Sequence, residues 1–317
     1  MTGDIASRTV ADIVRRGLGV SWSEAERLIL ARRIAVHGNL CLDPARRLRE
    51  GDVVNVHAES RDKLPEADEL EIVYEDRDLL VVNKPPGVTS VREPREKGLS
   101  KQRRDRQPTL DELLDKRLRK KAPPHKRHGP ANRPLIFPVH RLDRDTSGLM
   151  IFAKTAPAEL ELNRQFKVHA VDRSYLAVVR NGSPGRQTIT TQFVRDRGDG
   201  VRGSINSNAP AGQPTQRAVT HVEPAGRAGD LSIVACRLET GRTHQIRIHL
   251  AEIGHPICGD KTYGDRKETN RPPRQALHAA TLAFDHPLTG KRLEFERDWP
   301  ADICWWLKKQ AFPRRGG

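Results

Sequence analysis

The sequence predicts an α+β protein built on a mixed, mainly antiparallel sheet. Across the 317 residues, short runs rich in β-branched and aromatic residues outnumber helical patterns, and glycine, proline and asparagine bound these runs. The runs do not alternate regularly with helices, which argues against a doubly wound parallel sheet. The length allows two domains, and the pattern changes near residue 60. We therefore expect a small α+β module followed by a larger sheet domain.

The first 60 residues are predicted to form the small module. Apolar residues recur there at helical spacing in two groups, Val10, Ile13 and Val14, then Ala25, Leu28 and Ile29. Two overlapping S-x-x-E pairs, which begin at Ser21 and Ser23, match a capping box, so either serine can begin the second helix. That helix is expected over residues 23–33. IAVHGNL is expected to be a strand that enters a turn at residues 37–39, and DVVNVH a further short strand.

A polar stretch separates this module from the larger domain. RDKLPEADEL has little apolar content and one proline, so residues 61–69 are predicted to be a linker and residues 70–317 the larger domain. The strands expected in that domain are LEIVYED, DLLVVNKPPGV, LMIFA, SYLAVV, LSIVACRL and RLEFER. One helix is predicted at residues 156–166, and a long connection rich in glycine, proline and asparagine at residues 195–214.

The net charge of +15 is concentrated in one segment, residues 92–134, which holds 15 Lys/Arg against 6 Asp/Glu. Only TLDELLDKRL (109–118) has a helical stripe there, and the rest is expected to be a basic loop that orders on binding. Such a field attracts polyanions but carries no sequence information. A solvated run of charges has the same composition, so charge alone does not establish nucleic-acid binding.

Several classes of protein lack their usual signatures in this chain. No apolar run approaches the roughly 18 residues of a membrane span, and the start lacks the layout of a secretory signal. The four cysteines are far apart and form no C-x-x-C pair. We find no G-x-S-x-G, G-x-G-x-x-G or P-loop motif. The expectation is a cytoplasmic protein without a membrane anchor, a metal or another cofactor.

One candidate site lies in FPVHRLDRDTSGLMIFAK (137–154). Two aspartates, Asp143 and Asp145, alternate with Arg141 and Arg144, and a Thr-Ser-Gly turn then leads into an apolar strand. A carboxylate held beside a rigid strand but open on one side suits catalysis. Either aspartate can instead simply accept hydrogen bonds within the turn, and the residues alone favour that bland alternative.

A second cluster lies in LETGRTHQIRIHLAEIGHPICGDKTYG (238–264). If GRTHQIRIHL ends as a strand, Gln245, Arg247 and His249 form a polar face, opposite an apolar face that packs into the core. An arginine on that polar face can pair with a carboxylate of the first cluster and lower its pKa, although a purely structural ion pair has the same sequence. His244, His249 and His255 match no zinc-ligand spacing, so no metal site is expected.

Together the two clusters look like the signature blocks of the RluA-type family of RNA pseudouridine synthases. VVNKPPGV (81–88), RSYLAVV (173–179) and LHAATLAFDHPLTG (277–290) resemble three further blocks of that family. Residues 8–59 are similar to the alpha-L RNA-binding module, which is named after a ribosomal small-subunit protein and often precedes such catalytic domains. The 92–134 and 195–214 segments look enlarged for the family.

The resemblance implies catalytic roles for three residues. Asp143 matches the essential carboxylate, Arg247 the basic residue that pairs with it, and Tyr175 the tyrosine that contacts the flipped base and has been assigned a proton-transfer role. Asp145 falls at a position that we assign to turn structure.

The resemblance also implies residues that bind the RNA. Arg141 matches an arginine that fills the base stack when the target uridine swings out, and Ile246 an apolar position of the uracil pocket. Arg27, Arg32 and Arg33 are the candidates in the N-terminal module.

The implied reaction isomerises uridine to pseudouridine, which involves no redox change. The expected partner is a structured RNA, ribosomal RNA of the large subunit rather than transfer RNA, and the expected state is a monomer. The alternatives are a synthase that acts on transfer RNA, a non-catalytic RNA-binding protein of ribosome assembly, and a metal-dependent hydrolase.

Overall fold

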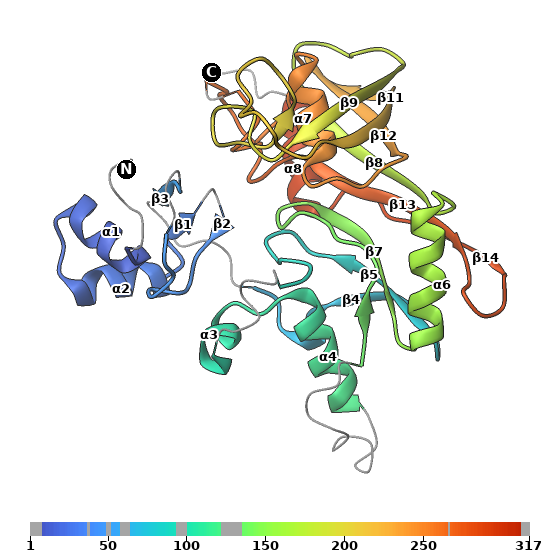
Figure 1. The fold of residues 1–317 in the computed structure, drawn as a ribbon, viewed down its shortest axis with the longest axis horizontal. Coiled ribbons are helices and arrows are strands. Elements are labelled where there is room, and N and C mark those ends of the chain that lie inside the picture. The colour runs from blue at the N-terminus through green and yellow to red at the C-terminus, as the bar shows by residue number, and fades with distance from the viewer. Residues whose placement is uncertain are drawn as a thin grey trace.

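The computed structural model describes residues 8–36, 39–48, 52–57, 64–92, 100–121, 135–265 and 267–311. In these ranges the chain forms a small three-stranded sheet with two helices and a larger sheet of eleven strands. Figure 1 shows the small N-terminal module to one side of the large sheet. The predicted α+β class is confirmed.

The N-terminal module packs two short helices, α1 (Val10–Leu18) and α2 (Trp22–Leu30), around their own apolar core. Its strands are β1 (Ile34–Val36), β2 (Asn39–Leu40) and β3 (Val54–Val56), in the order β2-β1-β3. Ser21 caps α2, because its hydroxyl accepts a hydrogen bond from the Glu24 amide at 3.2 Å. Of the two predicted capping serines, Ser21 is therefore the one that begins the helix.

The prediction that this helix reaches residue 33 is wrong. The helix ends at Leu30, and Arg32 adopts a left-handed backbone conformation with φ of 66°. A left-handed residue stops helical hydrogen bonding, so Arg32 and Arg33 follow the helix instead of lying on its face. Residues 37 and 38 of the predicted turn lie outside the described residues, but β1 and β2 pair in antiparallel fashion on either side of it.

The expected linker, residues 61–69, is described from residue 64 onward, and a 3₁₀ helix, η1 (Ala67–Glu69), forms there. Ala67 and Leu70 are buried in the core of the larger domain. This part of the polar stretch therefore packs against the large domain.

The large sheet has the strand order β10-β9-β11-β12-β8-β13-β7-β5-β4, with β14 beside β13 and β6 beside β7. Every pairing is antiparallel except that of β13 with β7, which is parallel. The strands are β4 (Glu71–Glu75), β5 (Leu79–Lys84), β6 (Phe137–Pro138), β7 (Ser147–Ala153), β8 (Asp172–Val179), β9 (Gln187–Val194), β10 (Gly203–Ser204), β11 (Gln216–Ala228), β12 (Leu231–Leu238), β13 (Leu277–Asp285) and β14 (Arg292–Glu296). The six strands predicted in this domain are all present.

Five helices of the described chain accompany this sheet. They are α3 (Lys101–Arg106), α4 (Leu110–Lys121), α6 (Ala156–Lys167), α7 (Gln245–Glu252) and α8 (Ala301–Ala311). The helices predicted at 109–118 and 156–166 are confirmed, and α3 is an addition within the segment expected to be a basic loop. Residues 93–99 and 122–134 of that segment lie outside the described residues. None of the described helices is both long and apolar enough to span a bilayer.

The strand predicted at the end of GRTHQIRIHL is wrong, because this segment forms α7. The first six residues of α7 are all buried. A helix that is buried all round needs no polar face, so the alternation of polar and apolar residues did not report a strand.

Candidate active site

A cavity of about 500 Å³ opens where the loop before β7, strand β8 and the segment between β12 and α7 meet. The lining includes five residues predicted from the sequence and a histidine, namely Arg141, Asp143, Tyr175, Ile246, Arg247 and His244. Residues from three distant parts of the chain thus share one cavity.

Asp143 is presented by a loop that is fixed from several sides. The side-chain amine of Lys84, which is fully buried, donates to the carbonyl oxygens of Pro85, Val88 and Arg144 at 2.8–2.9 Å. The Asp143 carbonyl accepts from the Thr146 amide at 3.2 Å, which closes the turn that contains Asp145. The loop is therefore anchored through its backbone, and the Asp143 side chain remains available to the cavity.

Gly148, at the start of β7, determines how closely this loop approaches β13. Its φ is 117°, and a Cβ atom placed on it would lie 2.2 Å from the carbonyl oxygen of Ala279. Only glycine permits both this conformation and this contact. The close parallel pairing of β7 and β13 fixes the loop that carries Asp143 beside β8.

A buried array of alternating charges holds the carboxylate. Arg247 donates from Nη1 to Asp143 Oδ2 at 3.0 Å, and from Nε and Nη2 to the two oxygens of Asp260 at 2.7 and 2.9 Å. The Tyr263 ring lies against the guanidinium, 5.2 Å from its carbon to the ring centroid. The expected pairing of Arg247 with a carboxylate of the first cluster is thus present in the structure. Asp260, which no pairing rule singled out in the sequence, braces the arginine from behind.

The charges around Asp143 keep its carboxyl group ionised. Burial on its own raises the pKa of Asp143, but the positive charge of His244 at a pH low enough to protonate the imidazole, the charges of Arg247 and Arg141, and the hydrogen bond from Arg247 outweigh burial and hold that pKa below its ordinary value. At neutral pH, where the imidazole is uncharged, the two arginines supply the positive charge. The same contacts act on the arginine. Burial opposes its charge, but Asp260 and Asp143 raise the pKa of Arg247 further above its usual range.

Tyr175 and Ile246 give the cavity its apolar wall. Tyr175 lies in β8, opposite Cys236 of β12, and only 6% of it is exposed. Burial raises the pKa of its phenol, so the hydroxyl group stays protonated at neutral pH. Ile246, in the first turn of α7, is 4% exposed. Both side chains therefore present buried carbon surface to the same cavity as the carboxylate.

The three histidines of the second cluster do not gather around one point. His244 lies at the cavity, whereas His249 bonds to the hydroxyls of Thr220 and Thr191, and His255 bonds to the Arg180 carbonyl. Because each histidine has different neighbours, the three side chains do not converge on a point where they could coordinate one metal ion.

The predicted RNA-binding arginines divide into two groups. Arg141 is exposed at the cavity, whereas Arg27, Arg32 and Arg33 lie in the N-terminal module and do not line it. Figure 1 shows that module apart from the large sheet. The two parts are joined at Leu40, whose carbonyl accepts from Arg144 Nη1 at 3.0 Å and from Gln107 Nε2 at 2.8 Å. The loop that carries Asp143 is thus bonded to the N-terminal module.

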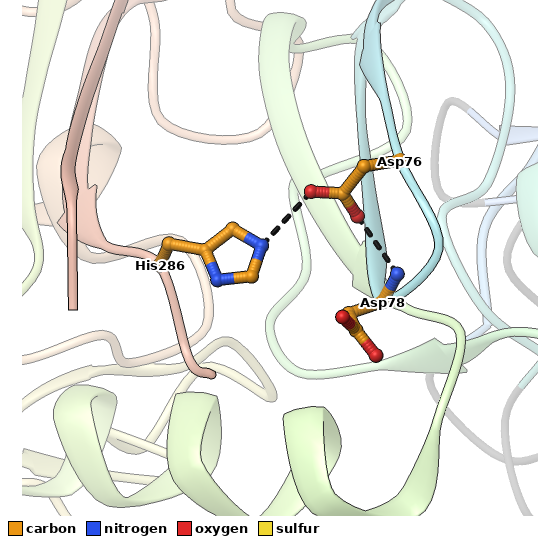
Figure 2. A group of neighbouring side chains, drawn as sticks. All are labelled: Asp76, Asp78 and His286. Atoms are coloured by element: carbon orange, nitrogen blue, oxygen red, sulfur yellow. Dashed lines mark hydrogen bonds and ion pairs between the residues drawn. The ribbon is translucent and has the colours of Figure 1, made fainter. Parts of the chain in front are cut away.

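One group of side chains elsewhere has the composition of a metal site. Figure 2 shows Asp76, Asp78 and His286, which form the one such group within the described residues. Nδ1 of His286 accepts from the Leu288 and Thr289 amides, so Nε2 carries the proton and donates to Asp76 at 2.9 Å. The other Asp76 oxygen accepts from two backbone amides. These hydrogen bonds hold the three residues together as part of a turn. A metal ion would need the lone pair of His286 Nε2, but in this tautomer Nε2 carries a hydrogen atom.

Comparison with known proteins identifies two regions of the chain. Residues 78–252 match the model of the RNA pseudouridylate synthase family, and residues 11–54 match the S4 domain. Ribosomal large subunit pseudouridine synthase D of Zymomonas mobilis is 35% identical over 96% of this chain and 92% of the relative. The enzyme of the same name from Vibrio cholerae is also 35% identical, over 89% of this chain and 85% of its own.

A solved structure supports the same assignment. Human RNA pseudouridylate synthase domain containing 1 superposes with a TM-score of 0.57 and 29% identity, covering 75% of this chain and 86% of its own. The resemblance read from the sequence is confirmed over both the N-terminal and the catalytic regions. The chain therefore belongs to the RNA pseudouridylate synthase family, whose members are uridine isomerases, and carries an S4 domain near its N-terminus.

Proposed function

We propose that this protein converts specific uridines of large-subunit ribosomal RNA into pseudouridine, and that Asp143 is its catalytic carboxylate. The observation that carries this proposal is an ionised carboxylate, paired with a buried arginine, at a cavity with an apolar wall. The names of the bacterial relatives support the ribosomal substrate.

The reaction breaks the bond from the ribose to uracil N1, turns the base, and joins the ribose to ring carbon five. A carboxylate can attack the sugar, attack the ring, or assist elimination, and each route requires it to be ionised. Arg247 supplies that condition by its contact with Asp143 Oδ2 at 3.0 Å. Tyr175 and Ile246 hold the plane of the base, since both present buried carbon surface to the cavity.

The substrate base must leave its helix to reach Asp143, at a cost of a few kcal/mol. Arg141, exposed at the cavity, fills the place that the base vacates. Three more cations, Lys167, Arg173 and Arg242, line the same cavity and can neutralise phosphates of the flanking nucleotides. These contacts offset the cost of extruding the base.

The N-terminal module adds affinity away from the cavity. Arg27, Arg32 and Arg33 are its proposed phosphate contacts, and the Arg27 side chain is 74% exposed. We propose residues 1–60 as this module, 61–69 as the linker and 70–317 as the catalytic domain, because the module has an apolar core separate from those of the large sheet. One chain holds both parts, which supports action as a monomer, and a ribosomal RNA substrate supports a cytoplasmic location.

The test of the catalytic assignment is Asp143→Asn on ribosomal RNA from a strain that lacks the gene. We expect pseudouridine formation to stop while RNA affinity and folding are kept, since the amide has the same shape but cannot ionise. Asp230→Asn, at an exposed turn between β11 and β12, is the matched control and should retain activity. Turnover by Asp143→Asn would refute the assigned role. If the Asp230→Asn control modifies ribosomal RNA but leaves transfer RNA unmodified, ribosomal RNA is favoured as the substrate over transfer RNA. If no uridine changes in either RNA, a non-catalytic RNA-binding protein is favoured.

A further inference from the structure

We propose that His244 is the base that removes the proton from ring carbon five of the target uracil, an inference that rests on the proposed isomerase function. Once the ribose has joined carbon five, that carbon still carries its hydrogen. The C5–H bond must break, its electron pair must restore the ring double bond, and the proton must pass to an acceptor. A proton from solvent completes N1, which has lost its ribose, so that the net reaction is an isomerisation.

The other candidate acceptors beside the carboxylate are poorly suited to this step. Tyr175 stays protonated at neutral pH, because burial raises the pKa of its phenol, so its oxygen has to lose a proton before it can act as a strong base. Asp143 is ionised, but Arg247 occupies one of its oxygens, and its pKa is below the ordinary value. A carboxylate of lowered pKa is a weak proton acceptor.

The tautomer of His244 is determined by its neighbour Tyr263. The Tyr263 hydroxyl donates its only proton to the Arg202 carbonyl oxygen, at 3.1 Å. Its oxygen can therefore only accept from His244 Nδ1, which lies 3.1 Å away. Nδ1 of the neutral imidazole thus carries the hydrogen, and Nε2 carries a free lone pair.

That lone pair lies beside the reacting carboxylate. His244 lines the cavity, and its Nε2 is 4.0 Å from Asp143 Oδ2. In the described part of the chain, the basic side chains with a nitrogen atom within 4.0 Å of the Asp143 carboxylate are Arg247 and His244. A uracil ring that contacts Asp143 therefore also lies close to His244 Nε2.

The backbone places the imidazole there at an energetic cost. His244 has a φ of 61°, a left-handed conformation that is uncommon for residues other than glycine, and it immediately precedes α7. Such strained conformations are concentrated at functional sites. In the same turn, Ile246 and Arg247 enter the cavity from the first residues of α7.

The charges that face His244 suit a base that works near neutral pH. They are Asp143 from the loop before β7, Arg247 from α7, Asp260 from the segment after α7, and Arg202 from the segment after β9. Burial lowers the pKa of His244, with Asp143 opposing this effect, so the imidazole is neutral at pH 7. When it takes up a proton, the neighbouring carboxylate stabilises the imidazolium. The side chain is 33% exposed, which lets the proton leave to solvent.

The experiment compares two substrates and two variants. His244→Phe and His244→Gln are tested on RNA with uridine at the target position and on the same RNA with 5-fluorouridine there. The fluorinated base has no proton at carbon five, so every step up to the new carbon–carbon bond proceeds on it without a base. We expect pseudouridine formation to fall about 10²–10⁴-fold in His244→Phe. Rearrangement of 5-fluorouridine, followed by mass spectrometry, and RNA affinity should remain as in the unmodified protein.

Two further readouts separate a base from a structural residue. In the unmodified protein, pseudouridine formation should decline as the pH falls and His244 becomes protonated, and His244→Gln should lose this acidic limb. Deuterium at carbon five should slow the Gln variant, because proton removal then limits the rate. His255→Phe, whose histidine bonds to the Arg180 carbonyl outside the cavity, is the matched control.

Each remaining outcome overturns the proposal. If the variants lose activity equally on uridine and on 5-fluorouridine, His244 acts in a step that precedes proton removal, as a positioning residue. Full pseudouridine formation by both variants would show that another group removes the proton. If the unmodified protein itself forms no pseudouridine, the failure lies with the proposed isomerase function, which the first measurement of the series detects.

Discussion

Replacing Asp260 with asparagine tests whether the buried array of charges positions the catalytic carboxylate. Asp260 is 5% exposed and accepts four hydrogen bonds, two from Arg247 and two from the amides of Thr262 and Tyr263. Asparagine keeps one acceptor oxygen and turns an N–H group toward the guanidinium. Arg247 then depends on Asp143 alone for its charge partner.

The expected loss of stability follows from these contacts. Breaking a buried ion pair by removing one partner costs about 3–5 kcal/mol. Asp143 still neutralises part of the charge, so we expect a value at the lower end, about 3 kcal/mol at pH 7. A guanidinium that is no longer braced also moves relative to Asp143, and a displacement of this kind can lower turnover by about 10²-fold.

The loss should depend on pH in a definite direction. Burial raises the pKa of Asp260, but Arg247 and the backbone amides outweigh burial and place that pKa below its ordinary value of 3.8. A carboxyl whose pKa is lowered by folding contributes stability that is present above its unfolded pKa and is lost as the pH falls through the folded value. The difference between the two proteins should therefore be constant near neutrality and shrink below about pH 4.

The assay is chemical unfolding at several pH values, combined with single-turnover pseudouridine formation. Asp302→Asn is the matched control, because Asp302 binds Arg274 through the same two-pronged contact but is 32% exposed and lies outside the cavity. We expect a smaller loss of stability and unchanged turnover in the control. If Asp260→Asn loses no more stability or turnover than Asp302→Asn, the reasoning that Asp260 positions Arg247 is refuted.

Three further variants test other parts of the structure. Gly148→Ala should lower the free energy of unfolding by about 3 kcal/mol or more, because its Cβ would lie 2.2 Å from the Ala279 carbonyl oxygen. A stable alanine variant would contradict the close approach of β7 to β13. Lys84→Met should destabilise by about 2–3 kcal/mol at pH 7, since three carbonyls lose their donor at about 1 kcal/mol each. Burial lowers the pKa of Lys84 to about 7. The unmodified protein should therefore gain stability relative to Lys84→Met as the pH rises from 7 toward 10.5. A difference in unfolding free energy that stays constant over this range would contradict the prediction. Arg27→Gln should weaken RNA binding. It should also make the slope of log K against log salt shallower, by less than about 1, and leave the turnover of bound RNA unchanged. An unaltered salt slope would remove Arg27 from the RNA interface.

Local patterns in the sequence determined much of the fold and the identity of the main reacting groups. The short apolar runs LMIFA and SYLAVV predicted β7 and β8, and two overlapping S-x-x-E pairs narrowed the start of α2 to Ser21 or Ser23. These features depend on neighbours a few residues apart, which the sequence shows directly. The signature blocks supplied Asp143, Arg247 and Tyr175, which the structure brings to one cavity.

The tertiary structure alone decided how these groups work together. Asp143 and Arg247 are 104 residues apart in the chain, and a contact at that separation leaves no local pattern. The same is true of Asp260 behind Arg247 and of the Tyr263 hydroxyl that fixes the tautomer of His244. The segment QIRIHL had the period of a strand but became α7, because burial on all sides removed the constraint that links side-chain polarity to secondary structure. Residue types were thus determined by the sequence, whereas their charges, tautomers and partners were set by packing between distant segments.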